Sequence, residues 1–222
     1  AGLTFEVVSE NGRSRIGTVK TSHGQFATPV FMPVGTQATI KSVLPSDVWE
    51  TGSSIILSNA YHLFLRPGPE VIRAAGGLHS FMNWPGSILT DSGGFQIMSL
   101  GQMVSISDEA AVFRSHIDGS LVRFSPEDAM KAQTAFGADI IMCLDQCIRH
   151  PATYYEAKEA MERSLLWARR SREEEIPDTQ SLFAIVHCSV FPELRKHCSL
   201  DLAALDFPGY AIGGLSVGES KD

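Results

Sequence analysis

Residues 87–94, with the sequence SILTDSGG, decide the fold class that we assign to this chain. The apolar residues Ile88 and Leu89 fit a short buried strand, and the strand is followed at once by Asp91, Ser92 and two glycines. A polar cluster directly after a buried strand is either a tight turn or one edge of a functional site. The rest of the chain helps to separate these two interpretations, because the same pattern recurs.

Short apolar runs of this kind alternate with helix-like stretches along the whole chain, which is typical of βα units and a parallel sheet. We expect six strands, within residues 29–36, 54–61, 87–94, 139–146, 182–189 and 209–216.

The stretches between the runs predict helices. Residues 125–137 have Ser125 as N-cap, Pro126 in the first turn and Gly137 at the end, which are the usual boundary signals. Longer amphipathic periodicity predicts a helix over 154–175, and shorter helices are expected at 46–52 and 69–77. The Ser- and Val-rich segment 97–124 predicts a β excursion with a hairpin turn at 116–119.

Nearly every run ends in a polar or glycine cluster, which favours a (β/α)₈ barrel, where the active face is built from all the strand C-termini. A doubly wound sheet, the alternative, binds ligands only near its switch point. Six strands are too few for eight, so we predict an incomplete (β/α)₈ TIM-like barrel of α/β class, forming one domain over residues 1–222. We expect something to cover the open edge.

Composition places the chain among soluble globular proteins, with 222 residues, 44% hydrophobic and 19% charged. No apolar run approaches the roughly 20 residues needed to cross a bilayer, and the start lacks signal-peptide character. A net charge of −7 argues against a general nucleic-acid coat, without excluding a local basic patch. Four cysteines without a C-x-x-C pair are expected to be reduced thiols of a cytoplasmic protein.

Asp91 is the first candidate for chemistry. A carboxylate held at the end of a barrel strand suits acid/base or nucleophilic work. Gly93 and Gly94 leave the backbone uncovered for a flat ligand, and Phe95 offers a ring for stacking. The alternative is a capping aspartate with turn glycines.

Asp145 is the second candidate, because residues 139–145 again end an apolar strand on a carboxylate. Carboxylates from neighbouring strands are expected to converge on one pocket mouth. Such a group accepts the N–H donors on the Watson–Crick edge of a guanine-like base. The alternative is a structural aspartate that caps the next helix.

The third candidate is the glycine-rich stretch 211–220, AIGGLSVGES. It resembles a phosphate-binding loop, but Glu219 replaces the lysine and would repel phosphate, so we exclude a nucleoside triphosphate site. Backbone N–H groups of Gly214 and Leu215 are expected to bond a carbonyl oxygen of a ligand. A plain glycine-rich turn remains the alternative.

His187 and Cys188 end the run at 182–189. Adjacent strand residues point to opposite faces, so the two cannot form a nucleophile–base pair, and we expect His187 to face the pocket. A metal site made from this pair and the pair His197–Cys198 is disfavoured, because the second pair falls in a predicted helix.

Together these stretches resemble a known family. The matching motifs run in order through nearly the whole chain: FMPVGTQAT, YHLFLRPG, the long block at 76–101, FSPED, GADIIM and YAIGGLSVGES. In these motifs the chain is similar to the tRNA-guanine transglycosylases, also called queuine or preQ1 tRNA-ribosyltransferases.

The resemblance implies a modified (β/α)₈ barrel and a pentosyltransferase that exchanges the wobble guanine of tRNAs with GUN anticodons for a 7-deazaguanine. It implies that Asp91 is a general acid/base and that Asp145 reads the base. It also implies substrate contacts at Asp91, Ser92, Phe95, Gln96, Asp145, Cys147, His187, Gly213, Gly214 and Leu215.

Cys147 and Val217 match positions that are typical of bacterial members, which implies the bacterial substrate 7-aminomethyl-7-deazaguanine (preQ1). The expected partners are therefore tRNA and either preQ1 or guanine. A homodimer is one assembly to test, and no membrane partner is expected.

Four departures from the family pattern matter. His187 and Cys188 replace a Gln-Gly pair, and this puts base selectivity in question, although a histidine donor can partly substitute. Ser58 and Ala60 alter the usual pocket support, and Gln146 replaces a glutamate. The family's nucleophilic aspartate, its zinc site of three cysteines and one histidine, and much of its tRNA surface are expected after residue 222.

The sequence therefore leaves three hypotheses. The first is the base-recognition part of an active transglycosylase, which the retention of both Asp91 and Asp145 favours. The second is a truncated or non-catalytic homologue that binds a 7-deazaguanine-like base or a partner subunit. The third, a small-molecule α/β binding domain without tRNA, has only the acidic net charge in its support.

Overall fold

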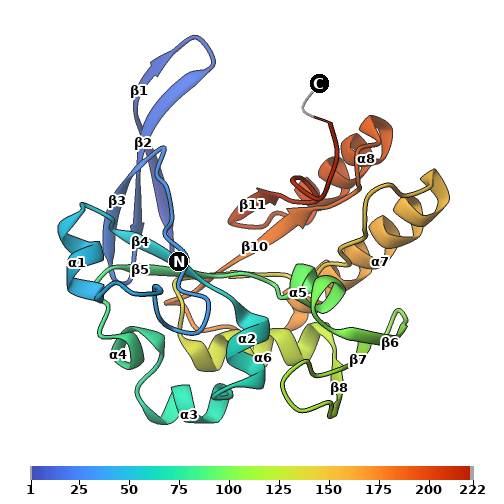
Figure 1. Cartoon of the computed structure of the whole chain (residues 1–222). Helices are drawn as coiled ribbons and strands as arrows, with labels where there is room; N and C mark the ends of the chain where they lie inside the picture. Colours follow the sequence, from blue (N-terminus) through green and yellow to red (C-terminus); the bar gives the residue numbers. More distant parts are fainter. Residues whose placement is uncertain (1, 221–222) are drawn as a thin grey trace. The chain divides into compact units, whose positions relative to one another are not determined.

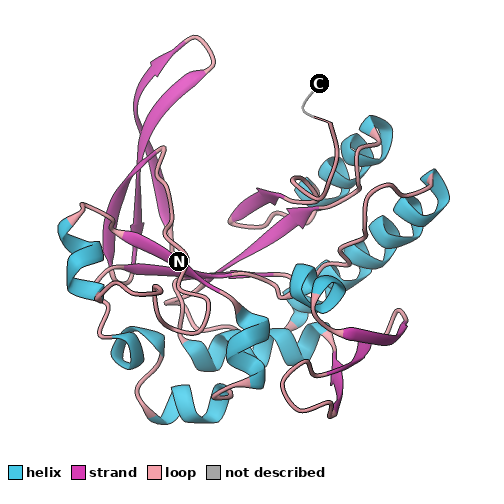
Figure 2. Cartoon of the chain, viewed as in Figure 1, coloured by secondary structure: helices cyan, strands magenta, loops and turns pink. Residues whose placement is uncertain are grey.

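The computed structural model describes residues 2–220, and Figure 1 labels its helices and strands. The chain forms two compact units that each draw on several segments of sequence. The first unit contains the chain up to Asp91, Lys131–Ile141 and Ile176–Ser181. The second contains Ser92–Met130, Met142–Glu175 and the chain from Leu182 onward. Both helices and strands occur throughout, as Figure 2 shows, so the fold is of the mixed α/β class.

The first unit begins with a three-stranded antiparallel sheet, which the sequence analysis did not predict. Its strands are β1 (Thr4–Asn11), β2 (Ser14–Thr21) and β3 (Gly24–Thr28), in the order β1-β2-β3. Gly12, with a φ of 62°, makes the tight turn between β1 and β2. Val19 and Phe26 are buried on one face, whereas every residue of β1 is exposed.

The same unit contains the start of a parallel sheet. Strand β4 (Ile55–Ser58) pairs with β5 (Ser87–Thr90), and β5 pairs with β9 (Ile140–Met142) through Leu89 and Ile140. Ile55, Ile56 and Ile88 have no exposed surface, as expected for parallel strands covered on both faces. The helices of this unit are α1 (Pro45–Glu50), α2 (Ala60–Leu65), α3 (Pro69–Ala74) and α4 (Leu78–Met82).

The strand expected within residues 29–36 is wrong. Only Val34 forms a bridge there, with Leu57 of β4. Leu57 N–H donates to the Pro33 carbonyl, and Gly35 N–H donates to the Leu57 carbonyl. Pro29 and Pro33 have no N–H to donate, so this segment cannot sustain a regular ladder.

The second unit contains the β excursion that was predicted for residues 97–124, and this prediction is confirmed. It is an antiparallel sheet of β6 (Gln102–Ile106), β7 (Ala111–Arg114) and β8 (Leu121–Phe124), preceded by helix α5 (Gly94–Ser99). The turn between β7 and β8 has Gly119 at a φ of 72°. Ser115 N–H donates to the Ser120 carbonyl across this turn.

The remaining strands of the second unit are β10 (Ser181–Val186) and β11 (Gly209–Ile212), which pair in parallel. The long predicted helix is confirmed as α7 (Tyr154–Glu173), which begins with a capping box between Thr153 and Glu156. It is followed by α8 (Pro192–Ala203). The helix predicted at 125–137 is also confirmed, as α6 (Pro126–Phe136), which runs through both units.

Five of the six predicted parallel strands therefore form. Two backbone hydrogen bonds tie β10 to the β9 segment: Ser181 N–H donates to the Asp139 carbonyl, and Cys143 N–H donates to the Phe183 carbonyl. Residues 2–220 contain a parallel sheet but no closed barrel. The (β/α)₈ architecture and the single-domain interpretation remain predictions.

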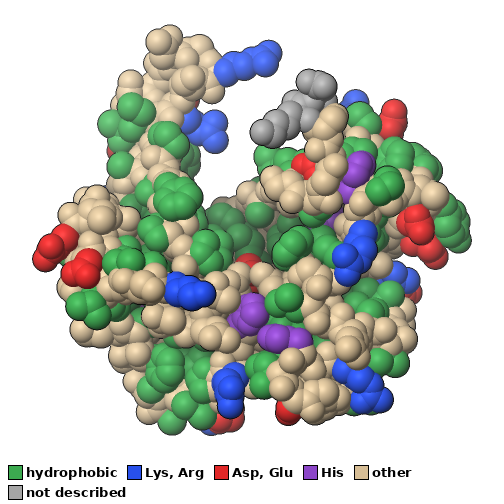
Figure 3. All heavy atoms as spheres, viewed as in Figure 1, with side chains coloured by type: hydrophobic (Ala, Val, Ile, Leu, Met, Phe, Trp, Pro, Cys, Tyr) green, Lys and Arg blue, Asp and Glu red, His purple; other side chains and the backbone are tan. Residues whose placement is uncertain are grey.

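The surface drawn in Figure 3 mixes charged and apolar side chains, with Lys and Arg spread over it rather than gathered in one patch. Within residues 2–220, no helix combines the length and the apolar character needed to cross a membrane.

Candidate functional site

Asp145 is the centre of the candidate site, and it lies just beyond the end of β9. Its side chain is buried, yet two polar side chains contact it. Ser92 Oγ donates to Asp145 Oδ1 at 2.6 Å, and His187 Nδ1 lies 2.8 Å from Asp145 Oδ2. All three residues belong to the second unit. The next helix along the chain, α7, is capped by Thr153, so Asp145 is not its cap.

The electrostatics of this pair favour two charged groups. Burial works to raise the pKa of Asp145, but the hydrogen bond and charge of His187, together with Ser92, outweigh it and hold this pKa below its ordinary value. Burial works to lower the pKa of His187, but Asp145, with a smaller contribution from Cys147, raises it to about 10. Asp145 is therefore a carboxylate at neutral pH, and His187 is its counter-ion.

The second of the two glycines after Ser92, Gly94, is required by close packing against Asp145. A Cβ added at Gly94 would lie 2.4 Å from the Asp145 carbonyl oxygen and 2.6 Å from Asp145 Oδ1. The backbone of α5 thus packs directly on the carboxylate, and Gly94 N–H donates to Ser92 Oγ at 3.1 Å. Only glycine allows this approach, and Ser92 is held in place between the helix start and Asp145.

His187 follows the last residue of β10, and only 3% of its surface is exposed. Its second ring nitrogen, Nε2, is buried and has no hydrogen-bond partner within residues 2–220. Gly214 lies beside this nitrogen, because an added Cβ there would be 3.0 Å from Nε2. The predicted glycine segment and His187 are therefore in contact.

The other predicted contact residues of this unit are placed as follows. Phe95 and Gln96 lie in the first turn of α5, with Phe95 49% exposed and Gln96 half-buried. Leu215 is exposed, and Cys147 is buried. Gln146 and Cys147 help to line a cavity of about 700 Å³, in which Arg163 Nη1 donates to Gln146 Oε1 at 2.6 Å.

Asp91 belongs to the first unit. Asn59 Nδ2 donates to its Oδ2, and the backbone N–H of Ala60, at the start of α2, donates to its Oδ1 at 2.8 Å. Asp91 thus carries out the capping role that was its structural alternative. Because Asp91 and Asp145 lie in different units, their convergence on one pocket remains a prediction.

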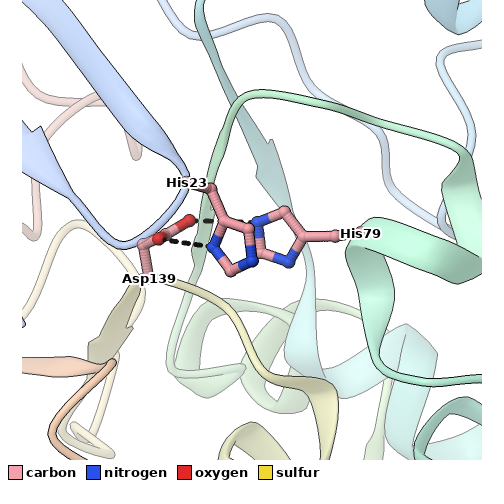
Figure 4. Close-up of side chains that lie close together, drawn as sticks. All are labelled: His23, His79 and Asp139. Carbon is pink, nitrogen blue, oxygen red and sulfur yellow. Dashed lines mark hydrogen bonds and ion pairs between the residues drawn. The ribbon is translucent and has the colours of Figure 1, made fainter.

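The structure also reveals a cluster that the sequence analysis missed. His23 Nδ1 lies 2.8 Å from Asp139 Oδ1, and His79 Nε2 lies 3.0 Å from Asp139 Oδ2. The two imidazoles are stacked, with ring centroids 3.5 Å apart, as Figure 4 shows. Ile88 N–H also donates to Asp139 Oδ2. These residues are 116 and 60 positions apart from Asp139, so no local motif could have indicated the cluster.

By residue type the cluster could hold a metal ion, since one ligand atom from each residue lies within 4.8 Å of the others. However, the stacked rings point both nitrogens in the same direction, at separate carboxylate oxygens. Hydrogen bonding therefore accounts for this geometry, whereas a metal needs lone pairs that converge on one point. We interpret the cluster as a clamp that joins the β2–β3 turn, α4 and β9.

A cavity of about 620 Å³ adjoins this clamp. Its lining is His23, Ser46, Trp49, Glu50, His79, Ser80, Asn83, Trp84 and Pro85.

A zinc site of three cysteines and one histidine does not fit residues 2–220. The cysteines Cys143, Cys147, Cys188 and Cys198 are all buried free thiols. Within the described part of the chain, His23, His79 and Asp139 are the only group of three potential ligands, and it contains no cysteine.

Comparison with known proteins agrees with the motifs. The family model described as Queuine tRNA-ribosyltransferase matches residues 10–222. A queuine tRNA-ribosyltransferase of Desulforamulus reducens is 50% identical over 220 residues, which cover 99% of this chain and 60% of the relative. One from Pelotomaculum thermopropionicum is 54% identical over 219 residues, 99% of this chain and 59% of the relative. One from Caldanaerobacter subterraneus is 49% identical over 225 residues, 100% of this chain and 60% of the relative.

The chain thus spans about 60% of the length of these relatives. About half of the residues are identical to those of each relative over nearly the whole chain, and the family model matches as well. The chain belongs to the queuine tRNA-ribosyltransferase family.

Proposed function

We propose that this chain supplies the base-recognition part of a tRNA-guanine transglycosylase. In the proposed reaction the wobble guanine of a tRNA with a GUN anticodon is exchanged for preQ1 during queuosine biosynthesis. The observation that carries this proposal is the buried carboxylate of Asp145, held by Ser92 and His187 beside a backbone that has no side chain at Gly94. A desolvated carboxylate with fixed partners suits recognition of ring N–H groups.

The proposed exchange is a double displacement. A carboxylate attacks the ribose C1′ as the bond from C1′ to guanine N9 breaks, and guanine leaves with a proton on N9. The incoming base loses its N9 proton, and its N9 then displaces the carboxylate from C1′. The family resemblance puts that nucleophile beyond residue 222, so this chain is assigned base binding and proton handling.

In this proposal Asp145 accepts the N–H donors of the base, and Phe95 stacks on its face. Asp91 moves the proton on the incoming base. The backbone of Gly213, Gly214 and Leu215 contacts the base, while Ser92 and Gln96 lie around base and ribose. Cys147 and Val217 support preQ1 as the incoming base, because the resemblance assigns them to bacterial members.

The family's zinc has no step in this proposal, because the described residues do not provide its ligands. The assembly state also remains a prediction, with a homodimer as the assembly to test.

Base exchange tests the proposal directly. A protein that contains this chain together with the part expected to carry the nucleophile is incubated with labelled guanine and an unmodified tRNA that carries a GUN anticodon, and label retained in the tRNA is counted. We expect the Asp91→Asn variant to lose incorporation. The Asp178→Asn variant, changed at an exposed aspartate, is the matched control and retains it. Incorporation that survives Asp91→Asn unchanged would contradict the assigned role.

The same assay separates the non-catalytic alternative. A protein that binds guanine tightly but never transfers label, in any length that includes this chain, is a base-binding homologue rather than an enzyme.

A further inference from the structure

The cavity beside the clamp lies at the amino ends of the parallel strands of the first unit. Trp84 and Pro85, which line it, precede β5, whereas Asp91 follows the carboxyl end of that strand. All of the lining residues belong to the first unit. Its volume of about 620 Å³ is in the size range of small-molecule sites, so its lining indicates what kind of molecule it would accept.

The buried carboxylate of Asp139 lies directly behind this cavity. Burial works to raise the pKa of Asp139, but hydrogen bonds from His79, His23 and the Ile88 N–H outweigh it and lower this pKa, so the group is ionised at neutral pH. Within residues 2–220, no lysine or arginine forms an ion pair with Asp139, and the imidazoles balance its charge only if they are protonated. A buried carboxylate without a cationic partner favours a cation nearby.

The two imidazoles present their second nitrogens to the cavity. An ionised carboxylate only accepts hydrogen bonds, so His23 Nδ1 and His79 Nε2 carry the hydrogens that face Asp139. In each neutral ring the opposite nitrogen, His23 Nε2 or His79 Nδ1, is then an acceptor. Neither nitrogen makes a hydrogen bond within residues 2–220, and Figure 4 shows both on the side of the rings away from Asp139. The cavity therefore receives two adjacent lone pairs.

Trp49 forms an aromatic wall of the cavity. Its indole is held in place, because an added Cβ at Gly86 would lie 2.8 Å from Trp49 Cζ3 and because Trp84 meets the ring edge-on at a centroid distance of 5.6 Å. Even so, 44% of the Trp49 surface is exposed. The face of an indole attracts cations more strongly than that of any other aromatic side chain.

The rest of the lining adds a second carboxylate and no basic side chain. Glu50 is exposed and forms no ion pair within the described residues. The other polar lining residues, Ser46, Ser80 and Asn83, are uncharged, and the described lining includes neither lysine nor arginine. Two carboxylates, two lone pairs and an aromatic face are together complementary to a cation with N–H donors, whereas both carboxylates would repel an anion.

We propose that this cavity is a binding site for a small organic dication, a linear aliphatic diamine. One ammonium group donates to His23 Nε2 and His79 Nδ1, the aliphatic chain crosses Trp49, and the second ammonium group is attracted by Glu50. The two imidazoles are stacked at an interplanar angle of 16°, so their lone pairs do not converge on one point as a metal ion requires. A primary ammonium group has three separate N–H donors and suits such parallel acceptors.

The first test uses the unsubstituted protein and 1,4-diaminobutane. With ¹⁵N-labelled histidine, the side-chain resonances of His23 and His79 are followed by NMR during the titration. His197, an exposed histidine of the second unit, is the internal control. We expect saturable shifts at His23 and His79 and none at His197. The uncharged analogue 1,4-butanediol and inorganic phosphate should produce no saturable shift.

The second test measures the affinity for 1,4-diaminobutane by isothermal titration calorimetry. Glu50→Gln removes the second carboxylate, and Trp49→Leu removes the aromatic wall. We expect each change to weaken binding by about 5- to 30-fold. Asp47→Asn is the matched control, because Asp47 is an exposed carboxylate of the same helix, α1, and does not line the cavity. This variant should bind the diamine as tightly as the unsubstituted protein does.

Saturable shifts at His23 and His79, together with weaker binding by Glu50→Gln and Trp49→Leu, would support the diamine site. Absence of these shifts would overturn it, and so would equal shifts with 1,4-butanediol or saturable binding of phosphate. Equal affinity in Glu50→Gln, Trp49→Leu and Asp47→Asn would also overturn it, because the diamine would then bind elsewhere. If Trp49→Leu does not fold, Glu50→Gln and the NMR titration decide.

Discussion

His187 Nδ1 and Asp145 Oδ2 are 2.8 Å apart, and both side chains are almost fully buried at the ends of parallel strands β10 and β9. A buried pair of this kind is strongly interdependent. Removing one partner leaves the other charge without compensation, which typically costs about 3–5 kcal/mol.

The pair predicts a defined pH dependence of stability. The pKa of His187 is raised from its ordinary 6.5 to about 10, so its contribution is complete below pH 6.5 and declines as the pH rises toward 10. The pKa of Asp145 is lowered, so its contribution is present above its ordinary 3.8 and is lost as the pH falls below that value.

We therefore expect the stability difference between the unsubstituted protein and His187→Gln to be largest between pH 3.8 and 6.5. Urea unfolding at a series of pH values measures this difference. A difference that does not vary from pH 4 to pH 10 would show that the pair is not ionic.

Gly94→Ala should disrupt the site. Its Cβ would lie 2.4 Å from the Asp145 carbonyl oxygen, a separation that requires the backbone to move. We expect a loss of about 3 kcal/mol or more in the free energy of unfolding, within the range of severe overpacking. Guanine binding should fall as well, because Ser92 and Asp145 shift together.

The matched control for this change is Gly119→Ala. An added Cβ there meets nothing within 4 Å, although the φ of 72° is strained for alanine. We expect the free energy of unfolding to fall by about 1 kcal/mol and guanine binding to be unchanged. Equal losses in the two variants would contradict the packing argument.

Asp139→Asn should destabilise the first unit. The carboxylate of Asp139 accepts hydrogen bonds from His23, His79 and the Ile88 N–H. The asparagine side chain would replace one of its oxygens with an NH₂ group, which would then face one of these donors. Burial opposes ionisation, but the bonds from His79 and His23 keep the pKa of Asp139 lowered, so its contribution should be lost in acid. We expect the free energy of unfolding at neutral pH, measured by urea unfolding, to fall by about 2–4 kcal/mol.

A zinc titration distinguishes the clamp from a metal site. Hydrogen bonding predicts that added Zn²⁺ leaves the melting temperature unchanged and that EDTA has no effect. Zinc-dependent stabilisation that disappears in His79→Asn would show instead that His23, His79 and Asp139 coordinate a metal.

Ser92→Ala should weaken base binding more than it weakens the fold. Ser92 Oγ holds Asp145 Oδ1 at 2.6 Å and accepts from Gly94 N–H. Loss of these bonds is expected to cost about 1 kcal/mol of stability, because His187 still pairs with the carboxylate. Guanine affinity is measured by equilibrium dialysis. An unchanged affinity would show that Ser92 has no role in base binding.

Strand positions could be predicted where an apolar run carried no other constraint. The runs containing Ile55, Ile88, Ile140, Ala184 and Ala211 all form parallel strands. The run at 29–36 has the same apolar character but contains two prolines, and these remove the donors that a strand needs. Proline therefore overrode hydrophobicity, and a stricter use of that rule would have excluded the strand.

The antiparallel sheet at the start of the chain was missed for a different reason. All residues of β1 are exposed, so the strand has no buried face and no clear alternation. Its signal was the turn at Gly12 between two stretches with only two β-branched apolar residues each, Val7 and Val8 before it and Ile16 and Val19 after it, a weaker cue than an apolar run.

Individual residues of the candidate site could be predicted from the sequence, but the contacts between them could not. The strand ends indicated Asp145 and His187 separately, but their ion pair depends on side-chain orientation, which periodicity does not contain. The clamp of His23, His79 and Asp139 could not be found at all, because each residue comes from a different part of the chain.

Guanine binding by the Asp145→Asn variant tests the central claim most directly. Equilibrium dialysis with labelled guanine compares this variant with the unsubstituted protein and with Asp178→Asn. We predict that the unsubstituted protein and Asp178→Asn bind equally, whereas Asp145→Asn binds at least about 100-fold more weakly. Equal guanine affinity in all three proteins would contradict the claim that Asp145 recognises the base.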